Sequence, residues 1–166
     1  MLFFCLERKE KHMRIIKYSI ALDNDRKCGL IKEKSSNYPE ISRLDSPQKI
    51  ADMLNIAYKA NTRAEEYLWL IAMDVKCNPI GVFEVSHGTV NQSCASPREI
   101  FVRLCLCGAA CFVIAHCHPS GDTTPSKEDI AFTKQLKSAS EIMSISMLDH
   151  IIIGQNYYSF KEEKIL

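Results

Sequence analysis

The spacing of two histidines and one aspartate is the feature of this sequence that most strongly indicates a metal-binding site. His116 and His118 lie two residues apart at the end of an apolar segment, 111–115, and Asp129 follows at the start of an expected helix. In a strand, residues i and i+2 point to the same side, so both imidazoles can be aimed at one point. Asp129 can add an oxygen from a second element. Two nitrogen ligands and one oxygen ligand leave one tetrahedral position open, as in catalytic zinc sites.

A metal site that hydrolyses a bond also needs a base for the water and a donor for the developing oxyanion. Ser126, three residues before Asp129, can place a hydroxyl near the metal. The base is expected to be a carboxylate from another part of the chain. We expect Glu66, at the junction between the first helix and the first long strand, to be this base. Its neighbour Glu65 and Glu84 on the second of these strands are the alternatives.

Composition places the chain among globular proteins. Its 166 residues are of the size of one domain, and a hydrophobic content of 46% is enough for a core. The formal net charge is +1, with acids and bases interspersed, which gives no support to a nucleic-acid or membrane-surface role. No secretory signal or membrane span is expected. Several of the eight cysteines lie in apolar segments, which indicates free thiols and a cytoplasmic location.

The elements that position these residues are predicted from caps and hydrophobic periodicity. Ser46 with Pro47, the capping box of Ser96 with Glu99, and Ser126 each open a helix. These helices are expected to end between 61 and 66, near 107 and near 139, and strands are expected over 14–22, 28–34, 67–73, 82–85, 111–115, 145–153 and 157–160. Residues 35–44 are expected to be irregular and 86–95 to form a loop. The order predicts an α/β or α+β domain with a mixed sheet and helices packed around it.

Two further observations concern the orientation of Asp129 and a second acidic–imidazole pair. On the third helix, Asp129 shares its face with Thr133 and Leu136, so its carboxylate points toward the core and needs a partner. Asp149 and His150 form a second acidic–imidazole pair. Because this pair lies inside an apolar strand, we expect it to make structural hydrogen bonds and to take no part in catalysis.

The same residues carry a resemblance to a known family. The run His116-x-His118-Pro119, six residues, Ser126-x-x-Asp129 resembles the metal-binding signature of the JAMM (MPN+, JAB1/MPN/Mov34) metalloproteases. The wider chain is similar to the bacterial RadC-like branch of that superfamily, whose marks are found here at 97–101, 118–122, 125–130 and 148–152. The resemblance covers about residues 45–166, and the segment from Met13 onward also resembles the leader of short RadC-like proteins.

The resemblance implies a fold, a cofactor and a reaction. The fold is of the JAB1/MPN type, cytidine-deaminase-like, with residues 1–44 as an N-terminal extension with short strands and 45–166 as the RadC-like JAB/MPN domain. One Zn²⁺ ion is implied at His116, His118 and Asp129, with a water in the fourth position. Glu66, aligned with the glutamate at the end of the family's first helix, is implied as general base, and Ser126 as oxyanion donor. The implied reaction is hydrolysis of a peptide or isopeptide bond in a protein or peptide substrate.

Two departures from the family pattern leave alternatives open. RadC-like proteins usually have asparagine between the two histidines, where this chain has Cys117. Strand alternation directs that side chain away from the metal, but if the strand ends earlier the thiol can approach the zinc. The helix-hairpin-helix module of longer RadC proteins is not evident here, so a nucleic-acid partner has little support. The alternative functions are a DNA repair or recombination accessory protein and a metal-binding pseudoenzyme.

Overall fold

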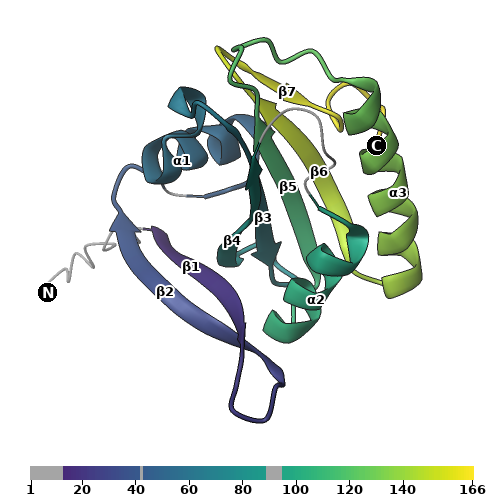
Figure 1. The fold of residues 1–166 in the computed structure, drawn as a ribbon. Coiled ribbons are helices and arrows are strands. Elements are labelled where there is room, and N and C mark those ends of the chain that lie inside the picture. Colours follow the sequence, from purple (N-terminus) through teal and green to yellow (C-terminus); the bar gives the residue numbers. More distant parts are fainter. Residues whose placement is uncertain (1–12, 42, 89–94) are drawn as a thin grey trace, which may run out of the picture.

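A seven-stranded mixed sheet organises the computed structural model, which describes residues 13–41, 43–88 and 95–166. The strand order in the sheet is β2-β1-β4-β3-β5-β6-β7 (Figure 1). The strands are β1 (Met13–Leu22), β2 (Cys28–Tyr38), β3 (Glu66–Met73), β4 (Pro79–Gly88), β5 (Cys111–Cys117), β6 (Ser146–Ile153) and β7 (Tyr157–Ser159). The helical elements are α1 (Pro47–Tyr58), the short 3₁₀ turn η1 (Ala60–Thr62), α2 (Pro97–Cys107) and α3 (Lys127–Met143).

The pairing of the strands confirms the predicted mixed sheet. Strand β3 is antiparallel to both β4 and β5, and the short connection between β3 and β4 is typical of an antiparallel pair. Strands β5 and β6 are parallel, and helix α3 makes the crossover that a parallel pair requires. Strand β7 then returns antiparallel to β6 and forms a hairpin with it.

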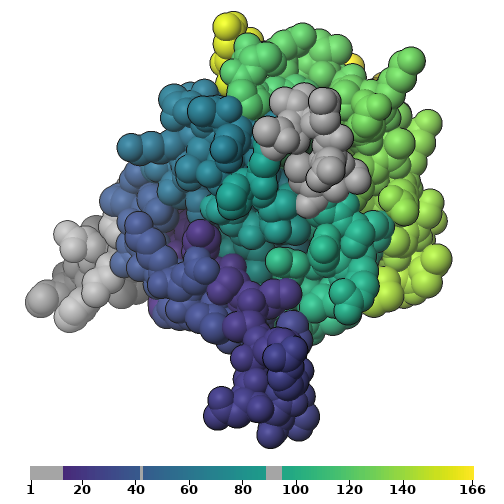
Figure 2. Space-filling model, in the orientation of Figure 1, coloured from purple at the N-terminus to yellow at the C-terminus, as the bar shows by residue number. Residues whose placement is uncertain are grey.

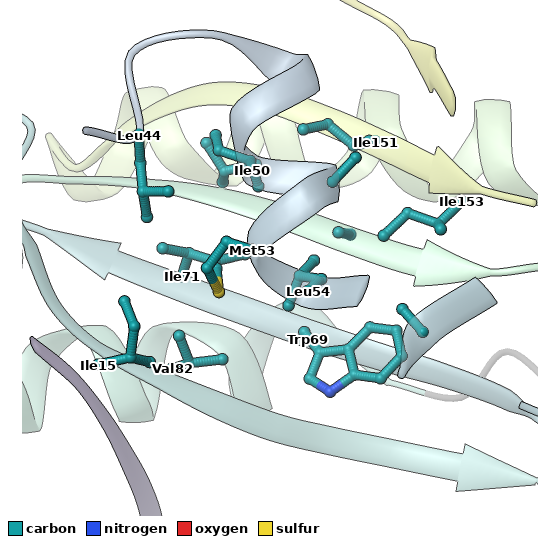
Figure 3. Close-up of a cluster of buried hydrophobic side chains, with 14 of the residues drawn as sticks. Ile15, Leu44, Ile50, Met53, Leu54, Trp69, Ile71, Val82, Ile151 and Ile153 are labelled. Carbon is teal, nitrogen blue, oxygen red and sulfur yellow. The ribbon is translucent and has the colours of Figure 1, made fainter. Parts of the chain in front are cut away.

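Helices cover both faces of the sheet, and strand alternation divides the core between these faces. Helix α1 covers one face, and α2 and α3 cover the other (Figure 1). In β3, Trp69 and Ile71 pack on the α1 face (Figure 3), whereas Leu68 and Leu70 pack on the α2/α3 face. Every residue of β5 is buried, as its apolar composition predicts for a strand covered on both sides. Among the described residues, no helix is long and apolar enough to cross a membrane.

The strands of the N-terminal extension belong to the same sheet. Strands β1 and β2 form an antiparallel hairpin, whose tip projects from the body of the molecule (Figure 2). Strand β1 joins β4 through the parallel pairs Lys17–Val82 and Tyr18–Phe83. Strand β2 continues to Tyr38, so the prediction of irregular structure from residue 35 was wrong at its start, because ten residue pairs with β1 hold the strand. The division into an extension and a domain at residue 44 stays a prediction.

The boundaries of several elements differ from the sequence-based ones. Helix α1 ends at Tyr58, earlier than predicted, because Lys59 adopts a left-handed conformation and donates its backbone N–H to carbonyls of the last turn. Glu66 is therefore the first residue of β3 and does not lie at a helix end. Strand β5 runs to Cys117 and includes His116. The predicted loop 86–95 begins later, since β4 continues to Gly88, and its segment 89–94 lies outside the described residues.

Candidate metal centre

The carboxyl end of β5 and the first turn of α3 bring the three predicted ligands together. His116 lies in β5 and His118 directly follows it, and their Nε2 atoms are 3.0 Å apart. Asp129 Oδ1 lies 3.2 Å from His116 Nε2, and Asp129 Oδ2 lies 3.6 Å from His118 Nε2. One ligand atom from each of these residues can be chosen so that all lie within 4.8 Å of one another. The three residues therefore form a group that could hold a metal ion.

The separations of these atoms match those of ligands around one small cation. Zinc binds nitrogen and oxygen at about 2.0–2.1 Å, so neighbouring ligand atoms in a tetrahedral site are about 3.3 Å apart. The two imidazole nitrogens are 3.0 Å apart, and the carboxylate contacts them at 3.2 Å through Oδ1 and at 3.6 Å through Oδ2, so these contacts are of similar size. The group is therefore compact enough to surround one ion.

The hydrogen-bond partners of His118 determine which of its nitrogens is free for a metal. Its Nδ1 lies 2.7 Å from the backbone carbonyl oxygen of Asp122. Because a carbonyl only accepts hydrogen bonds, Nδ1 carries the proton and the neutral ring has its lone pair on Nε2. That lone pair points toward His116 Nε2 and the Asp129 carboxylate. Such an arrangement is favourable when a proton or a cation lies between these atoms.

A capping box fixes the third ligand. Ser126 is the N-cap of α3, and its Oγ accepts a hydrogen bond from the Asp129 backbone N–H at 3.0 Å. The Ser126 backbone N–H and hydroxyl contact Asp129 Oδ2 at 2.8 and 2.6 Å. This local motif therefore holds Oδ2 and leaves Oδ1 directed at His116. Ser126 itself is exposed to solvent.

The charges in the centre favour an ionised carboxylate. Burial raises the pKa of the Asp129 carboxyl, but the hydrogen bonds and charges of His116 and His118 outweigh burial and hold that pKa well below its usual range. Asp129 in turn raises the pKa of His118, chiefly through its hydrogen bond to that ring. These charges favour a cation at this place, and a proton would compete with a metal for His118.

Glu66 lies beside this centre on the neighbouring strand. The pair Leu68–His116 lies at one end of the β3–β5 pairing. Glu66, two residues before Leu68, and His118, two residues after His116, lie just beyond this end. Glu66 therefore shares the α2/α3 face with Leu68, the face on which the imidazoles lie. The negative charge of Glu66 is one of the smaller causes that raise the pKa of His118, after the hydrogen bond that the protonated ring donates to Asp129. The carboxylate is half-buried.

The two alternative carboxylates have other partners. Glu84 pairs with Trp69 across β3 and β4, which places it on the α1 face, and its Oε2 lies 3.4 Å from Lys17 Nζ. Glu65 lies with its Oε2 3.5 Å from Nδ1 of the exposed His87. The structure thus brings only Glu66 of these three to the face of the sheet that carries the imidazoles.

Cys117 points away from the metal ligands. It packs in the core on the α1 face, and its Sγ lies 3.5 Å from the Glu65 carbonyl oxygen. Burial raises the pKa of this thiol, which disfavours the thiolate that a metal would need. The side chains of β5 therefore alternate between the two faces of the sheet as far as residue 117.

We expect Cys117→Ala to leave metal binding unchanged. The substitution removes a buried sulfur on the opposite face, so the free energy of unfolding falls by about 1 kcal/mol. Metal stoichiometry by elemental analysis and a denaturation curve check the two effects. A loss of bound metal in this variant would contradict the assignment of Cys117 to the core.

The turn between β6 and β7 supports the segment that carries His118. The His118 backbone N–H donates to Ile153, and the Gln155 N–H donates to the Gly121 carbonyl at 2.9 Å. Gly121 has a φ of 81°, in the left-handed region that favours glycine. A side-chain carbon at Gly154 would come within 2.3 Å of the Gly121 carbonyl oxygen, so only glycine permits this close approach.

Gly154→Ala is therefore expected to displace the 118–122 segment. The backbone contact cannot be relieved by a side-chain movement, so we expect a loss of about 1–3 kcal/mol in unfolding free energy together with weaker metal binding. Gly29→Ala is the matched control, because an added carbon there meets nothing within 4 Å. Metal titration and chemical denaturation of both variants check this, and equal behaviour of the two would count against the supporting role of the turn.

Two residues near the centre were not predicted to take part in it. His150 lies on β6 with its Nε2 2.8 Å from His116 Nδ1, and Thr133 Oγ1 lies 2.6 Å from His150 Nδ1. Asp149, by contrast, makes structural hydrogen bonds to backbone and to Ser159, as expected. The position of Thr133 four residues after Asp129 was a usable signal in the sequence. The contact of His150 with His116 depends on strand pairing and had no local signal.

Comparison with known proteins agrees with this architecture. The profile of the RadC-like JAB domain matches residues 44–165. The chain is 42% identical over 127 residues to a "UPF0758 protein" of Pelobacter propionicus, which covers 76% of this chain and 55% of the relative. It is 44% identical over 111 residues to a "UPF0758 protein" of Carboxydothermus hydrogenoformans, covering 66% and 49%. The chain spans about half the length of the curated relatives it matches. With a matching profile over most of its length, and a seven-stranded sheet flanked by helices, this chain belongs to the RadC-like JAB domain family.

Proposed function

We propose that this chain is a zinc-dependent hydrolase of the JAMM type that cleaves a peptide or isopeptide bond in a protein or peptide substrate. The observation that carries the proposal is the group of His116, His118 and Asp129. Its ligand atoms lie close enough together to surround one ion, and its carboxylate is held ionised. Three protein ligands leave a fourth position for water or substrate.

The donor set supports zinc as the resident ion. Two imidazole nitrogens and one carboxylate oxygen are ligands that zinc accepts in catalytic sites. A zinc ion bound there would act as a Lewis acid, lowering the pKa of a water molecule to about 7 and polarising the scissile carbonyl.

Side chains of this protein would perform the proton transfers. Glu66, on the same face of the sheet as the imidazoles, would accept a proton from the attacking water and return it to the leaving amine. The exposed hydroxyl of Ser126 is the proposed donor to the oxyanion. Its hydrogen bond to Asp129 Oδ2 must be exchanged for one to the substrate, so we propose that Ser126 both orients Asp129 and stabilises the transition state.

A reducing location suits this assignment. The described cysteines are all free: Cys28, Cys77, Cys105, Cys107, Cys111 and Cys117. Free thiols persist in the cytoplasm, where we propose that the protein acts.

Metal analysis combined with a cleavage assay tests the proposal. We expect one zinc ion per chain after purification without chelators, and cleavage of peptide or isopeptide substrates that stops on chelation and returns with added zinc. A protein that binds no metal under these conditions overturns the proposal. A titration with duplex DNA at several salt concentrations tests the DNA-repair alternative, because phosphate contacts make the affinity fall steeply with salt. A formal charge of +1 gives that alternative no support.

A further inference from the structure

A chain of three hydrogen bonds lies behind the candidate metal ligands. His116 Nδ1 is 2.8 Å from His150 Nε2, and His150 Nδ1 is 2.6 Å from Thr133 Oγ1. The Thr133 hydroxyl lies 2.6 Å from the backbone carbonyl oxygen of Asp129, four residues earlier in α3. The chain therefore begins at one candidate ligand, His116, and ends at the backbone of another, Asp129, and it passes through two residues outside the ligand group.

The backbone carbonyl oxygen of Asp129, at one end of this chain, sets the direction of every hydrogen bond in it. A carbonyl cannot donate, so the Thr133 hydroxyl donates its single proton to Asp129. The hydroxyl must then accept from His150, whose proton is on Nδ1 and whose lone pair is on Nε2. That lone pair accepts from Nδ1 of His116. The lone pair of His116 is left on Nε2, the atom that lies 3.2 Å from Asp129 Oδ1.

We infer that His150 and Thr133 are positioning residues that hold His116 in the tautomer and orientation needed for metal binding. The inference rests on the proposed metal function for its consequence, but the hydrogen-bond direction itself needs no metal. Outer partners of metal-bound histidines generally fix the tautomer in this way, and their loss costs about 10- to 100-fold in metal affinity. Here that outer partner is a second histidine, which can donate to and accept from its neighbours at the same time.

Among the described residues, the imidazole of His150 has no hydrogen-bond partner besides His116 and Thr133. The residue is 1% exposed, its ring stacks on Phe160 at 4.7 Å between centroids, and Phe132 meets it edge-on. Thr133 is equally buried, with 1% exposure. Because both residues are buried, water cannot replace either hydrogen bond. A substitution that removes the polar atom of one residue must therefore interrupt the chain of hydrogen bonds. The rigid packing also explains how β6 and α3 can orient a side chain on β5.

Thr133→Val and Thr133→Ser form the decisive pair of variants. Valine keeps the shape of threonine but removes the hydroxyl, whereas serine keeps the hydroxyl. We expect zinc affinity, measured by competition with a chromogenic chelator, to fall about 10-fold or more in Thr133→Val and to return to within about threefold of wild type in Thr133→Ser. His150→Phe, which keeps an aromatic ring against Phe160, is expected to behave like Thr133→Val.

The nitrogen NMR chemical shifts of the His116 ring give a readout that needs no metal. In the wild-type protein without metal we expect the tautomer with the proton on Nδ1, and in His150→Phe a shift toward the Nε2–H form. Unfolding curves of the same samples show whether each variant is folded. If His116 keeps its tautomer in folded His150→Phe, or if Thr133→Val binds zinc as tightly as wild type, the inference is wrong. If the wild type binds no zinc while the tautomer responds as expected, the proposed function fails and the positioning role stands.

Discussion

Glu66→Gln should abolish nearly all hydrolysis while leaving the zinc in place. Glutamine has the size of glutamate but cannot accept a proton from water, and loss of a general base typically lowers the rate by about 10²- to 10⁴-fold. Glu66 lies next to the group of ligands and does not belong to it, so metal stoichiometry is expected to remain that of wild type. The measurement is kcat on a cleavable peptide together with elemental analysis of the same preparation.

The neighbouring carboxylates provide matched controls for this experiment. Glu65→Gln removes an exposed charge beside His87, and Glu84→Gln removes a charge paired with Lys17 on the α1 face. Both variants are expected to retain kcat within about threefold of wild type, because the structure brings neither carboxylate to the face of the sheet that carries the imidazoles. A Glu84→Gln variant that loses activity while Glu66→Gln retains it would reverse the assignment of the base.

Asp129→Asn should release the metal from the site. Asparagine is nearly the same size and can still accept the Ser126 hydrogen bonds, but it lacks the charge that neutralises a cation. Because removal of an outer partner alone costs about 10- to 100-fold, removal of a direct ligand should weaken zinc binding by more than about 100-fold. Glu128→Gln, which removes an exposed charge in the same first turn of α3, is the control and is expected to bind zinc normally.

The pH dependence of zinc binding gives a second test of Asp129. The pKa of His118 is raised, chiefly by Asp129, so in the wild-type protein protons compete with zinc up to a pH above the usual histidine value of about 6.5. Affinity should therefore rise with pH through that region. In Asp129→Asn the carboxylate that raises the pKa of His118 is gone, and the midpoint of this rise should move to lower pH. A midpoint that stays in place would contradict the coupling between the two residues.

Glu66→Gln and Asp129→Asn distinguish residues needed for metal binding from residues needed for catalysis alone. Loss of Asp129 should remove both zinc and activity, whereas loss of Glu66 should remove activity alone. Loss of Thr133 or His150 should weaken zinc binding while the chain stays folded. The three patterns differ, so a shared failure to fold cannot imitate them.

Local periodicity was sufficient to predict much of the candidate site. His116 and His118 were predicted to share one side from the two-residue repeat of a strand, and they do. The spacing of Ser126 and Asp129 predicted a helix start with the carboxylate turned toward the core, and a capping box is present there. The same alternation predicted that Cys117 points away from the imidazoles, which its packing on the α1 face confirms.

Only the tertiary structure decided which distant residues complete the site. The choice between Glu66 and Glu84 depends on how β3 pairs with β4 and β5, where a shift of one residue moves a side chain to the other face. A register irregularity between Leu68 and Trp69 sets Glu84 opposite Trp69, on the α1 face. The contact of His150 with His116 likewise depends on the register of the parallel strands β5 and β6, which has its own irregularity.

The sequence by itself thus predicted the group of three candidate ligands and the local elements that carry them, because each follows from a repeat or cap within a few residues. The position of Glu66, the proposed base, and the hydrogen-bond chain through His150 and Thr133 were decided by the fold. They join strands and helices that are far apart in the chain, and the pairing of those strands is set by burial over the whole sheet, which no short segment encodes.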